Sequence, residues 1–354
     1  MRDFEQHYKD LSLVAPGTLL YEGLENILRA RTGALIVVGD SPEVWAIVNG
    51  GFKIDAELHP AALYELAKMD GAIVISSDAK RILLANTHLT PDPMIPSHET
   101  GTRHRTAERV ARQTGSMVIS ISQRRNVITV YKSNWKYVLR DVSVILAKAN
   151  QALATLEKYK TVFQQSLTNL SALEFEDLVT LADVATVLQR SQMVSRIANE
   201  ISRYVLQLGS EGRLVHMQLE ELMVDIKDEG RLVFEDYVQL DEVDPQAAWE
   251  EVESWDSEDL LNPSLMSKAL GYSAGISSLE QAVVPRGYRI LAKIPRLPMP
   301  VIENLVREFG SLPAVMEASI EELDDVEGIG EVRAKAIKEG LRRLREQVLV
   351  DRQL

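Results

Sequence analysis

The sequence predicts a multidomain chain that joins a mixed-sheet α/β domain to all-α regions. Residues 1–140 alternate short β-branched runs with helical patterns, which is typical of a mixed sheet with helices packed on it. Residues 141–285 have apolar positions spaced three and four apart, as in helices that pack on one another. Residues 286–354 contain a repeat of helix, tight turn and helix. We therefore expect three domains with these boundaries, the second a helical bundle or spine and the third a tandem helix-hairpin-helix domain.

The composition is that of a globular protein without a disulfide framework. The 354 residues are 45% hydrophobic and include no cysteine, which excludes disulfides, thiolate zinc sites and cysteine nucleophiles. The six histidines are scattered without metal-ligand spacing. No apolar run approaches the roughly 20 residues of a membrane span. The sequence thus predicts a cytoplasmic protein with no membrane partner.

Charge is distributed unevenly along the chain. The net charge of −13, taken alone, argues against a nucleic-acid partner. Residues 1–140 hold 17 basic and 15 acidic residues, a net of +2. Residues 141–285 hold 10 and 25, a net of −15, whereas residues 286–354 hold 12 of each. Because the excess negative charge lies in residues 141–285, the amino-terminal and carboxy-terminal regions are each able to bind phosphate groups.

The first 140 residues are expected to form one mixed sheet. Two helices are predicted early in this stretch, one around residues 19–31 and one that Pro60 starts and "AALYELAKM" continues. The strand-like runs are "GALIVVGD", "EVWAIVNGG", the hairpin "GAIVISSDAKRILLANT", and the pair "SMVISIS" and "NVITVYK", which "QRR" joins.

The middle of the chain is expected to be a structural spacer or an assembly surface. A helical pattern runs from residue 141 to about 237, and "VSVILAKANQALATLEKYKTVFQQSLTNL" lacks glycine and proline. Residues 241–278 are acidic and then richer in glycine and serine, so they either connect domains or complete the bundle.

A cluster of cations stands at a predicted helix start in "GTRHRTAERVARQTG", residues 101–115. Arg103, His104 and Arg105 lie in the first turn, where like charge costs roughly 0.3 to 1 kcal/mol per residue. An anion would reverse that cost, because free backbone N–H groups, the helix dipole and forked guanidinium groups would all converge on a phosphate.

Thr102 is expected to cap this helix and Gly115 to end it. The alternative to a phosphate site is that the arginines extend into solvent or pair with carboxylates such as Glu99 and Glu108.

Asp70 stands where the helix "PAALYELAKM" is predicted to end. A carboxylate near the partially negative end of a helix is disfavoured, and a divalent cation would reverse the balance, so Asp70 is a candidate metal ligand. Gly71 follows and allows another group to approach the backbone closely. The alternative is an ordinary Asp-Gly turn.

Together these two features describe a cation held by a carboxylate and a polyphosphate held by arginines, which is the minimal equipment for phosphoryl or nucleotidyl transfer. No Walker A loop is present, which argues against an ordinary P-loop NTPase. The segments "DGAIVIS" (70–76) and "GTRHRTA" (101–107) resemble the DGA and RHR motif pair of the diadenylate cyclase family. With the helical middle and the tandem turns, the resemblance to bacterial members of that family spans essentially the whole chain.

The resemblance implies an activity and a set of site residues. Two ATP molecules would be condensed into cyclic di-AMP with release of two pyrophosphates, using Mg²⁺ or Mn²⁺. Asp70 would bind the metal and help to activate the ribose 3′-hydroxyl, and the backbone around Leu89 would face adenine. The residues expected to bind ATP are Gly71, Ala72, Leu89, Thr102, Arg103, His104, Arg105, Thr106, Ser122 and Arg124.

This product imposes a geometric condition. Each 3′-hydroxyl must attack the α-phosphate of the opposite ATP in line, so the two nucleotides lie antiparallel across a two-fold axis. One chain carries one copy of each motif, so two chains must meet face to face, each with a half-site. The monomer is expected to be inactive, and the resemblance implies an octamer.

The carboxy-terminal repeat has a period of 32 residues, with "KIPRLPMPVIENL" set over "DVEGIGEVRAKAI". In the second copy, Gly328 and Gly330 let the turn present backbone N–H groups to a DNA phosphate. Arg333 and Lys335 would add contacts to the DNA backbone. Such contacts read phosphate spacing rather than base sequence, so DNA of unusual shape is the expected partner. The alternative is a turn used only in protein packing.

The first copy departs from this form, since Arg296 and Pro298 stand where the second copy has its two glycines. Proline has no N–H to donate, so this turn cannot make the same phosphate contact. The balanced charge of the domain predicts weak binding per copy, which several copies in an oligomer would strengthen.

The leading hypothesis is a DNA-regulated diadenylate cyclase of the cytoplasm and nucleoid. The resemblance implies that branched or damaged DNA lowers its activity. The main rival is a non-catalytic DNA-structure-binding protein whose first domain senses nucleotide without turnover. A third hypothesis is a helix-rich assembly scaffold, whose thermal stability ATP would not change.

Overall fold

The computed structural model describes residues 8–224, 226–273 and 276–351. The chain divides into two compact units. Unit 1 comprises the described residues up to 151 together with 201–217, and unit 2 comprises 152–200 and the described residues from 218 onward. The long helices α7 (Val142–Glu176) and α8 (Leu181–Leu208) contribute residues to both units.

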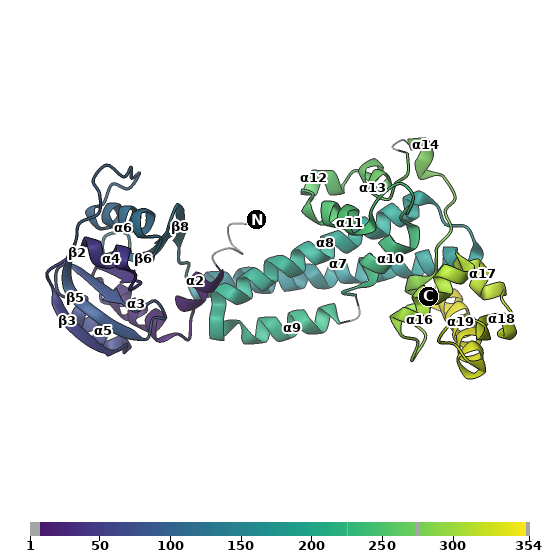
Figure 1. Ribbon diagram of the computed structural model, residues 1–354, viewed down its shortest axis with the longest axis horizontal. Helices are drawn as coiled ribbons and strands as arrows, with labels where there is room; N and C mark the ends of the chain where they lie inside the picture. Colours follow the sequence, from purple (N-terminus) through teal and green to yellow (C-terminus); the bar gives the residue numbers. More distant parts are fainter. Residues whose placement is uncertain (1–7, 225, 274–275, 352–354) are drawn as a thin grey trace. The chain divides into compact units, whose positions relative to one another are not determined.

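An eight-stranded mixed sheet forms the centre of unit 1 (Figure 1). Its order is β2-β5-β4-β1-β6-β7-β8, with β3 also paired to β5. β1 and β4 are parallel and the other pairs are antiparallel, as in the predicted hairpins β4–β5 and β6–β7. The strands are β1 (Ala34–Val38), β2 (Val48–Asn49), β3 (Phe52–Glu57), β4 (Ala72–Ile75), β5 (Arg81–Leu89), β6 (Met117–Ser122), β7 (Val127–Lys132) and β8 (Trp135–Val138).

Helices cover both faces of this sheet, because alternate strand residues point to opposite sides. Ile36 and Ile73 share one core with α3 and α5, and the next residues along each strand, Val37 and Val74, share a second core with α4 and α6. The helices that precede the last strand in sequence are α2 (Tyr8–Leu13), α3 (Leu19–Arg29), α4 (Pro42–Ile47), α5 (Pro60–Leu66) and α6 (Thr102–Thr114). The predicted α/β fold is confirmed as a three-layer domain.

The prediction of one strand, in the segment "EVWAIVNGG", is wrong. The run "EVWAIVNGG" lies mostly in helix α4, and only Val48–Asn49 continue as the short strand β2. Pro42 takes the first helical position, and Val44 and Ile47, three residues apart, are both buried in the core. Helical spacing therefore prevails here over β-branched composition. Strand β3 was not predicted, because its residues are mostly exposed and carry no hydrophobic signal.

Helices continue beyond α8, as expected from the middle of the sequence. They are α9 (Arg213–Met223), α10 (Glu229–Tyr237), α11 (Pro245–Ser254), α12 (Ser257–Leu260), α13 (Pro263–Ala269) and α14 (Ile276–Leu279). The acidic stretch from residue 241 onward is thus largely helical. In the part of the chain that the structure describes, no helix is long and apolar enough to cross a membrane.

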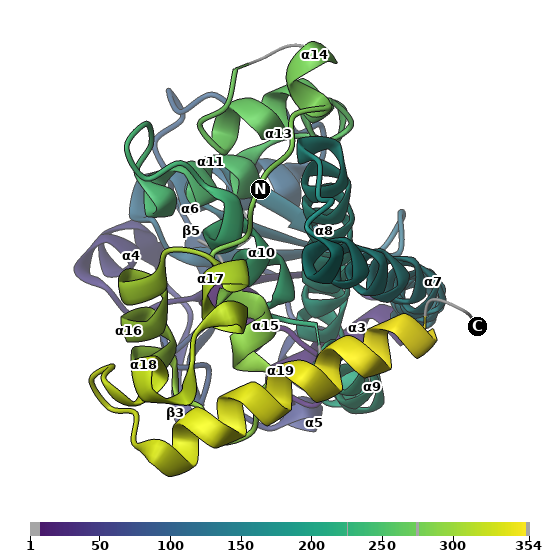
Figure 2. The ribbon, with the colours of Figure 1, turned by 90° about the vertical axis from the view of Figure 1, so that its right-hand side faces the viewer.

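Two copies of helix, turn and helix form the carboxy-terminal part of unit 2 (Figure 2). The first copy is α15 (Tyr288–Ala292) with α16 (Met299–Phe309), and the second is α18 (Ile320–Asp324) with α19 (Glu331–Asp351); α17 (Leu312–Glu317) lies between them in sequence. Both copies bury their apolar positions in one shared core. The predicted tandem arrangement is confirmed.

The two turns have matching backbones at the predicted period of 32. Arg296 and Gly328 occupy equivalent places, and both have positive φ, at 62° and 86°. Two residues later, the carbonyls of Pro298 and Gly330 each accept a first hydrogen bond of the following helix. Arg296 therefore adopts a left-handed conformation that favours glycine, because the packing of the repeat requires it.

A buried ion network fixes α15 to the helices around it. Asp236 of α10 accepts hydrogen bonds from the backbone N–H groups at the start of α15, which are those of Gly287 (2.7 Å), Tyr288 (2.6 Å) and Arg289 (3.1 Å). The fully buried guanidinium of Arg289 pairs with Glu174 of α7. Removal of one member would leave a buried charge or donor without its partner, so the network holds the first hairpin in place.

Candidate functional site

The cation cluster lies in the first turn of α6, which begins at Thr102. The N-cap is Gly101, with no side-chain hydrogen bond to the helix, so the expectation that Thr102 caps it is wrong; glycine is itself an acceptable N-cap residue. Arg105 N–H donates the first helical hydrogen bond, to Gly101 C=O at 2.8 Å. The three amides before it have no helical acceptor and are open toward a ligand. Gly115 ends α6 in the left-handed conformation, as predicted.

Both arginines of the cluster are exposed, but they lie differently. The Arg103 guanidinium packs against the backbone of Gly33, the residue before β1. A Cβ on Gly33 would collide with Nη1 of Arg103 and lie 3.0 Å from its Cζ. Arg105 Nε donates to the backbone C=O of Glu99 at 3.3 Å. Arg103 is thus held over the edge of the sheet.

The order of the strands brings several sequence-predicted residues to one end of the sheet. The pairing of β1 with β6 puts Gly33 level with Ser122, one step beyond the pair Ala34–Ile121. Asp70 ends the turn that leads into β4, the parallel neighbour of β1, at the same end of the sheet. The antiparallel pairing of β4 with β5 brings Leu89, the last residue of β5, to this same end of the sheet. These residues therefore lie at one end of four neighbouring strands, and Arg103 packs beside Gly33 there. We call Leu89, Asp70, Gly33 and Ser122 the edge row.

Asp70 does not follow directly on a helix end, and that expectation is wrong. Helix α5 ends at Leu66. Short-range bonds from Lys68 N–H to Glu65 C=O and from Met69 N–H to Leu66 C=O then turn the chain toward β4. The carboxylate of Asp70 is exposed at the end of this turn. Its place in the edge row, rather than a helix-end field, is what makes it a candidate ligand.

Gly71 has a φ of +89°, and a Cβ there would lie 2.7 Å from the Thr87 carbonyl oxygen. Glycine is therefore required, and the group that approaches it closely is the backbone of β5. Ala72 and Leu89 are 1% and 6% exposed, with side chains in the core. Their side chains are therefore not available to a nucleotide.

The remaining predicted ATP residues lie at or near the surface. Thr102 and Arg124 are exposed, and Thr106 and Ser122 are half-buried. Arg124 is in the turn between β6 and β7, as predicted, and the Ser122 hydroxyl accepts a hydrogen bond from Arg125 N–H at 3.1 Å.

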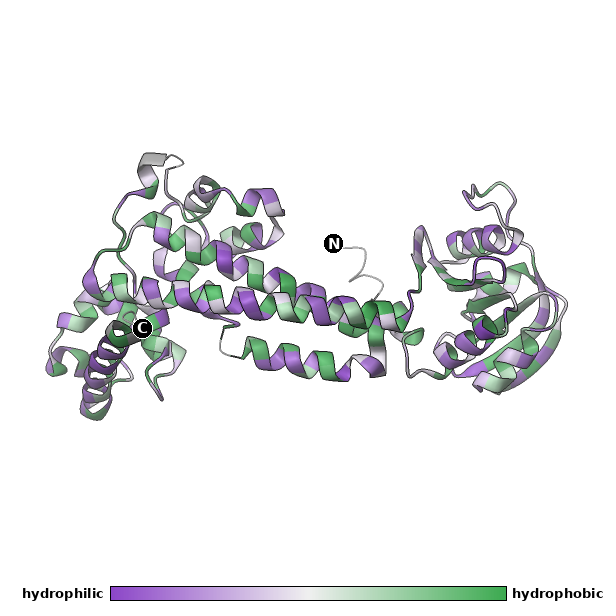
Figure 3. Cartoon of the chain, turned by 180° about the vertical axis from the view of Figure 1, so that it is seen from behind, coloured by the Kyte–Doolittle hydropathy of each residue, from purple (hydrophilic) through white to green (hydrophobic). Residues whose placement is uncertain are grey.

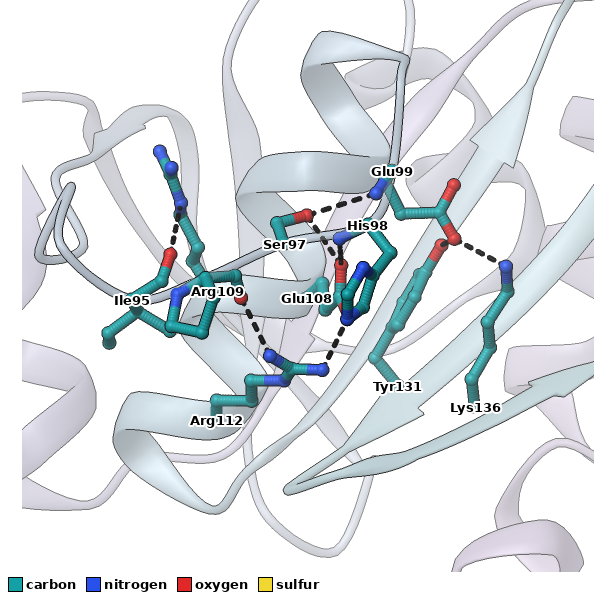
Figure 4. A network of polar contacts seen from close by, with 10 residues as sticks. Ile95, Ser97, His98, Glu99, Glu108, Arg109, Arg112, Tyr131 and Lys136 are labelled. Atoms are coloured by element: carbon teal, nitrogen blue, oxygen red, sulfur yellow. Dashed lines mark hydrogen bonds and ion pairs between the residues drawn. The ribbon is translucent and has the colours of Figure 1, made fainter.

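His104, by contrast, is buried, with 8% of its surface exposed. Its Nδ1 lies 2.9 Å from the Tyr131 hydroxyl of β7, and its Nε2 is buried without a hydrogen-bond partner in the described part of the chain. The Tyr131 hydroxyl lies 2.9 Å from the Glu99 carboxylate, which also pairs with Lys136 (Figure 4). The ring therefore reaches a phosphate only through Nε2. No motif in the sequence indicated Tyr131 or Lys136, because they meet His104 and Glu99 only in the folded chain.

Burial and charge set the protonation of this cluster. Burial lowers the pKa of His104; Glu99 opposes the shift, and nearby cations such as Arg125 add to it. Burial and the hydrogen bond to Glu99 raise the pKa of Tyr131, so its hydroxyl stays protonated. Burial alone would raise the pKa of Glu99, but hydrogen bonds from Lys136 and Tyr131 outweigh it and lower the pKa, so the carboxylate stays ionised.

The segment between β5 and α6 is tied to α6 by a second set of contacts (Figure 4). The Glu108 carboxylate accepts hydrogen bonds from the Ser97 hydroxyl at 2.5 Å and from His98 N–H at 3.1 Å. It also pairs with Arg112 at 2.8 Å. These contacts hold Glu99 beside the first turn of α6. Glu99 pairs with Lys136 and Glu108 with Arg112 rather than with the arginines of that turn. Both arginines are exposed, which agrees with the other half of that alternative, extension into solvent.

The second carboxy-terminal turn has the backbone predicted for a phosphate contact. Gly330 C=O accepts the first bond of α19, so the amides that follow are open. The side chains are engaged within the chain: the Arg333 guanidinium donates to Gly328 C=O at 2.5 Å, and Lys335 pairs with Glu331 at 2.5 Å. Glu331 also places a carboxylate in the first turn, which weakens the attraction for an anion.

A cationic groove runs beside α19, whose hydrophilic turns are purple in Figure 3. This cavity of about 650 Å³ is lined by four cations, with Glu339 the one acid among the lining residues. The cations are Lys335, Lys338, Arg342 and Arg345. Their spacing of three and four residues is the sequence signal for one helix face.

Family models match consecutive parts of the chain. "DisA bacterial checkpoint controller nucleotide-binding" matches residues 21–135, and "DisA bacterial checkpoint controller linker region" matches residues 139–279. "Helix-hairpin-helix motif" matches residues 311–340. The last match covers the second hairpin and not the first, in which Arg296 and Pro298 replace the glycines.

Curated relatives cover nearly the full length. The DNA integrity scanning protein DisA of Carboxydothermus hydrogenoformans is 62% identical over 338 residues, which are 95% of this chain and 96% of that protein. The protein of the same name from Symbiobacterium thermophilum is 58% identical over 357 residues, 100% of both chains. That of Clostridium botulinum strain Loch Maree is 57% identical over 342 residues, 97% of this chain and 96% of that protein.

The chain combines a nucleotide-binding sheet domain that carries the DGA and RHR segments, a helical region and a helix-hairpin-helix domain. This combination defines the class of diadenylate cyclases that also carry a DNA-binding domain. Within that class, the matches over the whole chain place it in one group. The chain belongs to the DisA family.

Proposed function

We propose that this chain condenses two molecules of ATP into cyclic di-AMP and two pyrophosphates. In each half-reaction the 3′-oxygen of one ATP bonds to the α-phosphorus of the other, the bond from that phosphorus to the pyrophosphate oxygen breaks, and the hydroxyl proton passes to solvent. The proposal is supported by the edge row: Asp70 leads into β4 at the end of the sheet where Gly33 leads into the neighbouring strand β1 and the Arg103 guanidinium packs beside Gly33.

Charge and position suggest the role of each residue. Arg103, Arg105 and the open amides of α6 would hold the triphosphate, where preorganised donors stabilise developing charge. Asp70 would assist the 3′-hydroxyl, and the backbone around Leu89 would face adenine. The residues that complete the proposed ATP site are Gly71, Ala72, Thr102, His104, Thr106, Ser122 and Arg124.

A divalent cation, Mg²⁺ or Mn²⁺, fits this arrangement if it arrives with the triphosphate. No group of three or more His, Cys, Asp or Glu side chains that could hold an ion occurs in the described residues. Mg²⁺ is commonly held by one or two carboxylates together with substrate phosphates, so the exposed Asp70 carboxylate suffices as its protein ligand. When bound, the ion neutralises charge on the transferring phosphate.

The complete site is proposed to need two chains. A single chain supplies one edge row, whereas the two reacting nucleotides must lie antiparallel for in-line attack. Two chains that meet face to face across a two-fold axis satisfy this condition, each with a half-site. The octamer implied by the family resemblance would contain four such pairs.

The carboxy-terminal domain is proposed to bind the backbone of branched or damaged DNA and to lower cyclic di-AMP synthesis. The amides after Gly330 would receive a phosphate, with Gly328 supplying the required turn. Arg333 and Lys335 would exchange their present contacts for phosphate oxygens. Balanced charge and one competent hairpin per chain support weak binding that an oligomer multiplies. We place this activity in the cytoplasm, at the nucleoid.

A product assay tests the proposed reaction. The pure protein is incubated with ATP and Mn²⁺, and the products are identified by mass spectrometry. Cyclic di-AMP and pyrophosphate in a one-to-two ratio are expected. Unchanged ATP, together with thermal stabilisation by the nucleotide, would instead identify a DNA-binding protein that senses nucleotide without turnover.

A further inference from the structure

The imidazole of His104 has a buried nitrogen with no partner at the place where an anion is expected. The side chain is more than nine-tenths buried, and Nε2 has no hydrogen-bond partner in the described part of the chain. Its neighbour in the ring, Cδ2, lies 3.5 Å from the position that a Cβ on Gly101 would take. The edge of the ring that carries Cδ2 and Nε2 therefore lies beside Gly101, the N-cap of α6.

The other ring nitrogen is held by a chain of hydrogen bonds that fixes its tautomer. Glu99 is ionised, since it pairs with Lys136, and can only accept. The Tyr131 hydroxyl must therefore give its proton to Glu99, at 2.9 Å. Its oxygen is left to accept, so Nδ1 of His104, 2.9 Å away, carries the hydrogen. In the neutral ring, Nε2 is then a bare acceptor.

The charges around the ring keep it neutral in the absence of an anion. Arg103 and Arg105 flank it on its own helix, Arg125 faces it from the β6–β7 turn, and Lys136 from β8. Burial is the largest cause of the lowered pKa of the ring; Arg125, Lys136 and Arg103 add to it, and Glu99 opposes it. The neutral ring offers only an acceptor at Nε2, and a triphosphate also offers only acceptors. The two therefore form a hydrogen bond only if the ring gains a proton.

We propose that His104 takes up one proton from solvent when the triphosphate binds, and that Nε2–H then donates to a phosphate oxygen. Glu99 and Tyr131 are the positioning residues, because they hold Nδ1–H in place and balance the imidazolium charge through the tyrosine hydroxyl. The triphosphate supplies negative charge where the arginines alone would repel the proton. The identity of this anion rests on the proposed function.

The coupling between protonation of His104 and binding of the triphosphate has a direction that can be measured. The pKa of the ring is low in the free chain and rises when the triphosphate is bound, so binding takes up a proton at pH values between the two. Within that window the affinity for the nucleotide strengthens as pH falls, by up to about tenfold per pH unit for one coupled proton. The window begins below the usual pKa of histidine, since burial lowers the pKa of the free ring.

The test is calorimetric titration of the full-length protein with Mg²⁺ and the non-reacting analogue α,β-methylene-ATP, in two buffers of different ionisation enthalpy. The difference in heat gives the protons taken up per site. Wild type is expected to take up about one proton more per site than His104→Asn. The variant serves as the reference because protons exchanged by the phosphates of the analogue contribute equally to both measurements. Tyr131→Phe and Glu99→Gln are expected to lose most of that difference.

The matched control is Tyr21→Phe, which removes a similar tyrosine–glutamate bond (3.1 Å to Glu25) on α3, outside the proposed site. It is expected to keep the wild-type proton uptake. In steady state, Tyr131→Phe should raise KM for ATP about tenfold, as for loss of one hydrogen bond to a charged group, and flatten its pH dependence, while kcat changes less.

Two outcomes separate this inference from the proposed function. If wild type makes cyclic di-AMP but takes up no more protons than His104→Asn, or if Tyr131→Phe and Glu99→Gln both retain the wild-type uptake, the inference is overturned. If wild type makes no cyclic di-AMP yet shows the extra proton with the analogue, the inference stands and the proposed function fails. If Tyr131→Phe does not fold, the proton uptake of Glu99→Gln alone tests the inference.

Discussion

Replacement of Gly33 by alanine should disable the nucleotide site although Gly33 belongs to neither motif. Gly33 has no positive φ, so its backbone accepts alanine. The new methyl group would collide with Nη1 of Arg103 and lie 3.0 Å from its Cζ. Arginine is flexible and exposed at this point, so the guanidinium is expected to move off the edge row rather than the strand to move.

The size of the effect follows from what Arg103 does. Hydrogen bonds to charged groups contribute about 1.5 to 3 kcal/mol each, so displacement of the guanidinium should lower kcat/KM for ATP about 10- to 100-fold. Stability should change little. The methyl group also meets the Ile121 carbonyl oxygen at 3.1 Å, a small strain that we expect to cost about 1 kcal/mol or less of the free energy of unfolding.

The assay compares wild type, Gly33→Ala, Arg103→Ala and the double variant by cyclic di-AMP formation and urea unfolding. If Gly33→Ala acts through Arg103, it should change kcat/KM less than about twofold in the Arg103→Ala background, because the displaced group is already absent. An equal loss of activity in both backgrounds would refute the reasoning, since the substitution would then act through the sheet. So would wild-type activity of Gly33→Ala.

Three further variants test other parts of the account. Asp70→Asn should abolish cyclic di-AMP synthesis while the oligomer measured by light scattering is unchanged; retained turnover would remove Asp70 from its role. Asp236→Ala leaves three backbone N–H groups without their acceptor, so urea unfolding should show a loss of about 3 kcal/mol, and an unchanged midpoint would contradict the network. Arg333→Ala should weaken binding to a four-way DNA junction and lower the slope of log affinity against log salt concentration by about one phosphate contact. Arg343→Ala, a control on the same helix whose side chain pairs with Glu339, should change neither the affinity nor that slope.

Local signals predicted the elements that carry the site. The cation cluster at 103–105 sits in a first helical turn, as the sequence indicated, and the hairpins on either side of it are where the β-branched runs placed them. The period of 32 likewise predicted the two carboxy-terminal turns, because a tight turn is a local property of the chain. Strand order then brings the start of β4, which follows Asp70, to the same end of the sheet as Gly33, beside which Arg103 packs.

Contacts between distant residues could not be predicted in the same way. Tyr131 and His104 are 27 positions apart, and nothing in their spacing shows that they share a hydrogen bond. The engagement of Glu99 by Lys136 depends on the pairing of β7 with β8. The helix α4 was mistaken for a strand because three-residue spacing in a segment of six residues is too short to outweigh its β-branched composition.

The central claim is that Asp70 and the first turn of α6 form a half-site that a second chain completes. The most direct measurement is the specific activity with ATP and Mn²⁺ across a dilution series in which the mass of the particle is followed by light scattering and the product by mass spectrometry. The account predicts cyclic di-AMP at a rate per chain that falls to zero as the monomer fraction approaches one. Unchanged specific activity in a verified monomer, or unchanged ATP at every concentration, would contradict it.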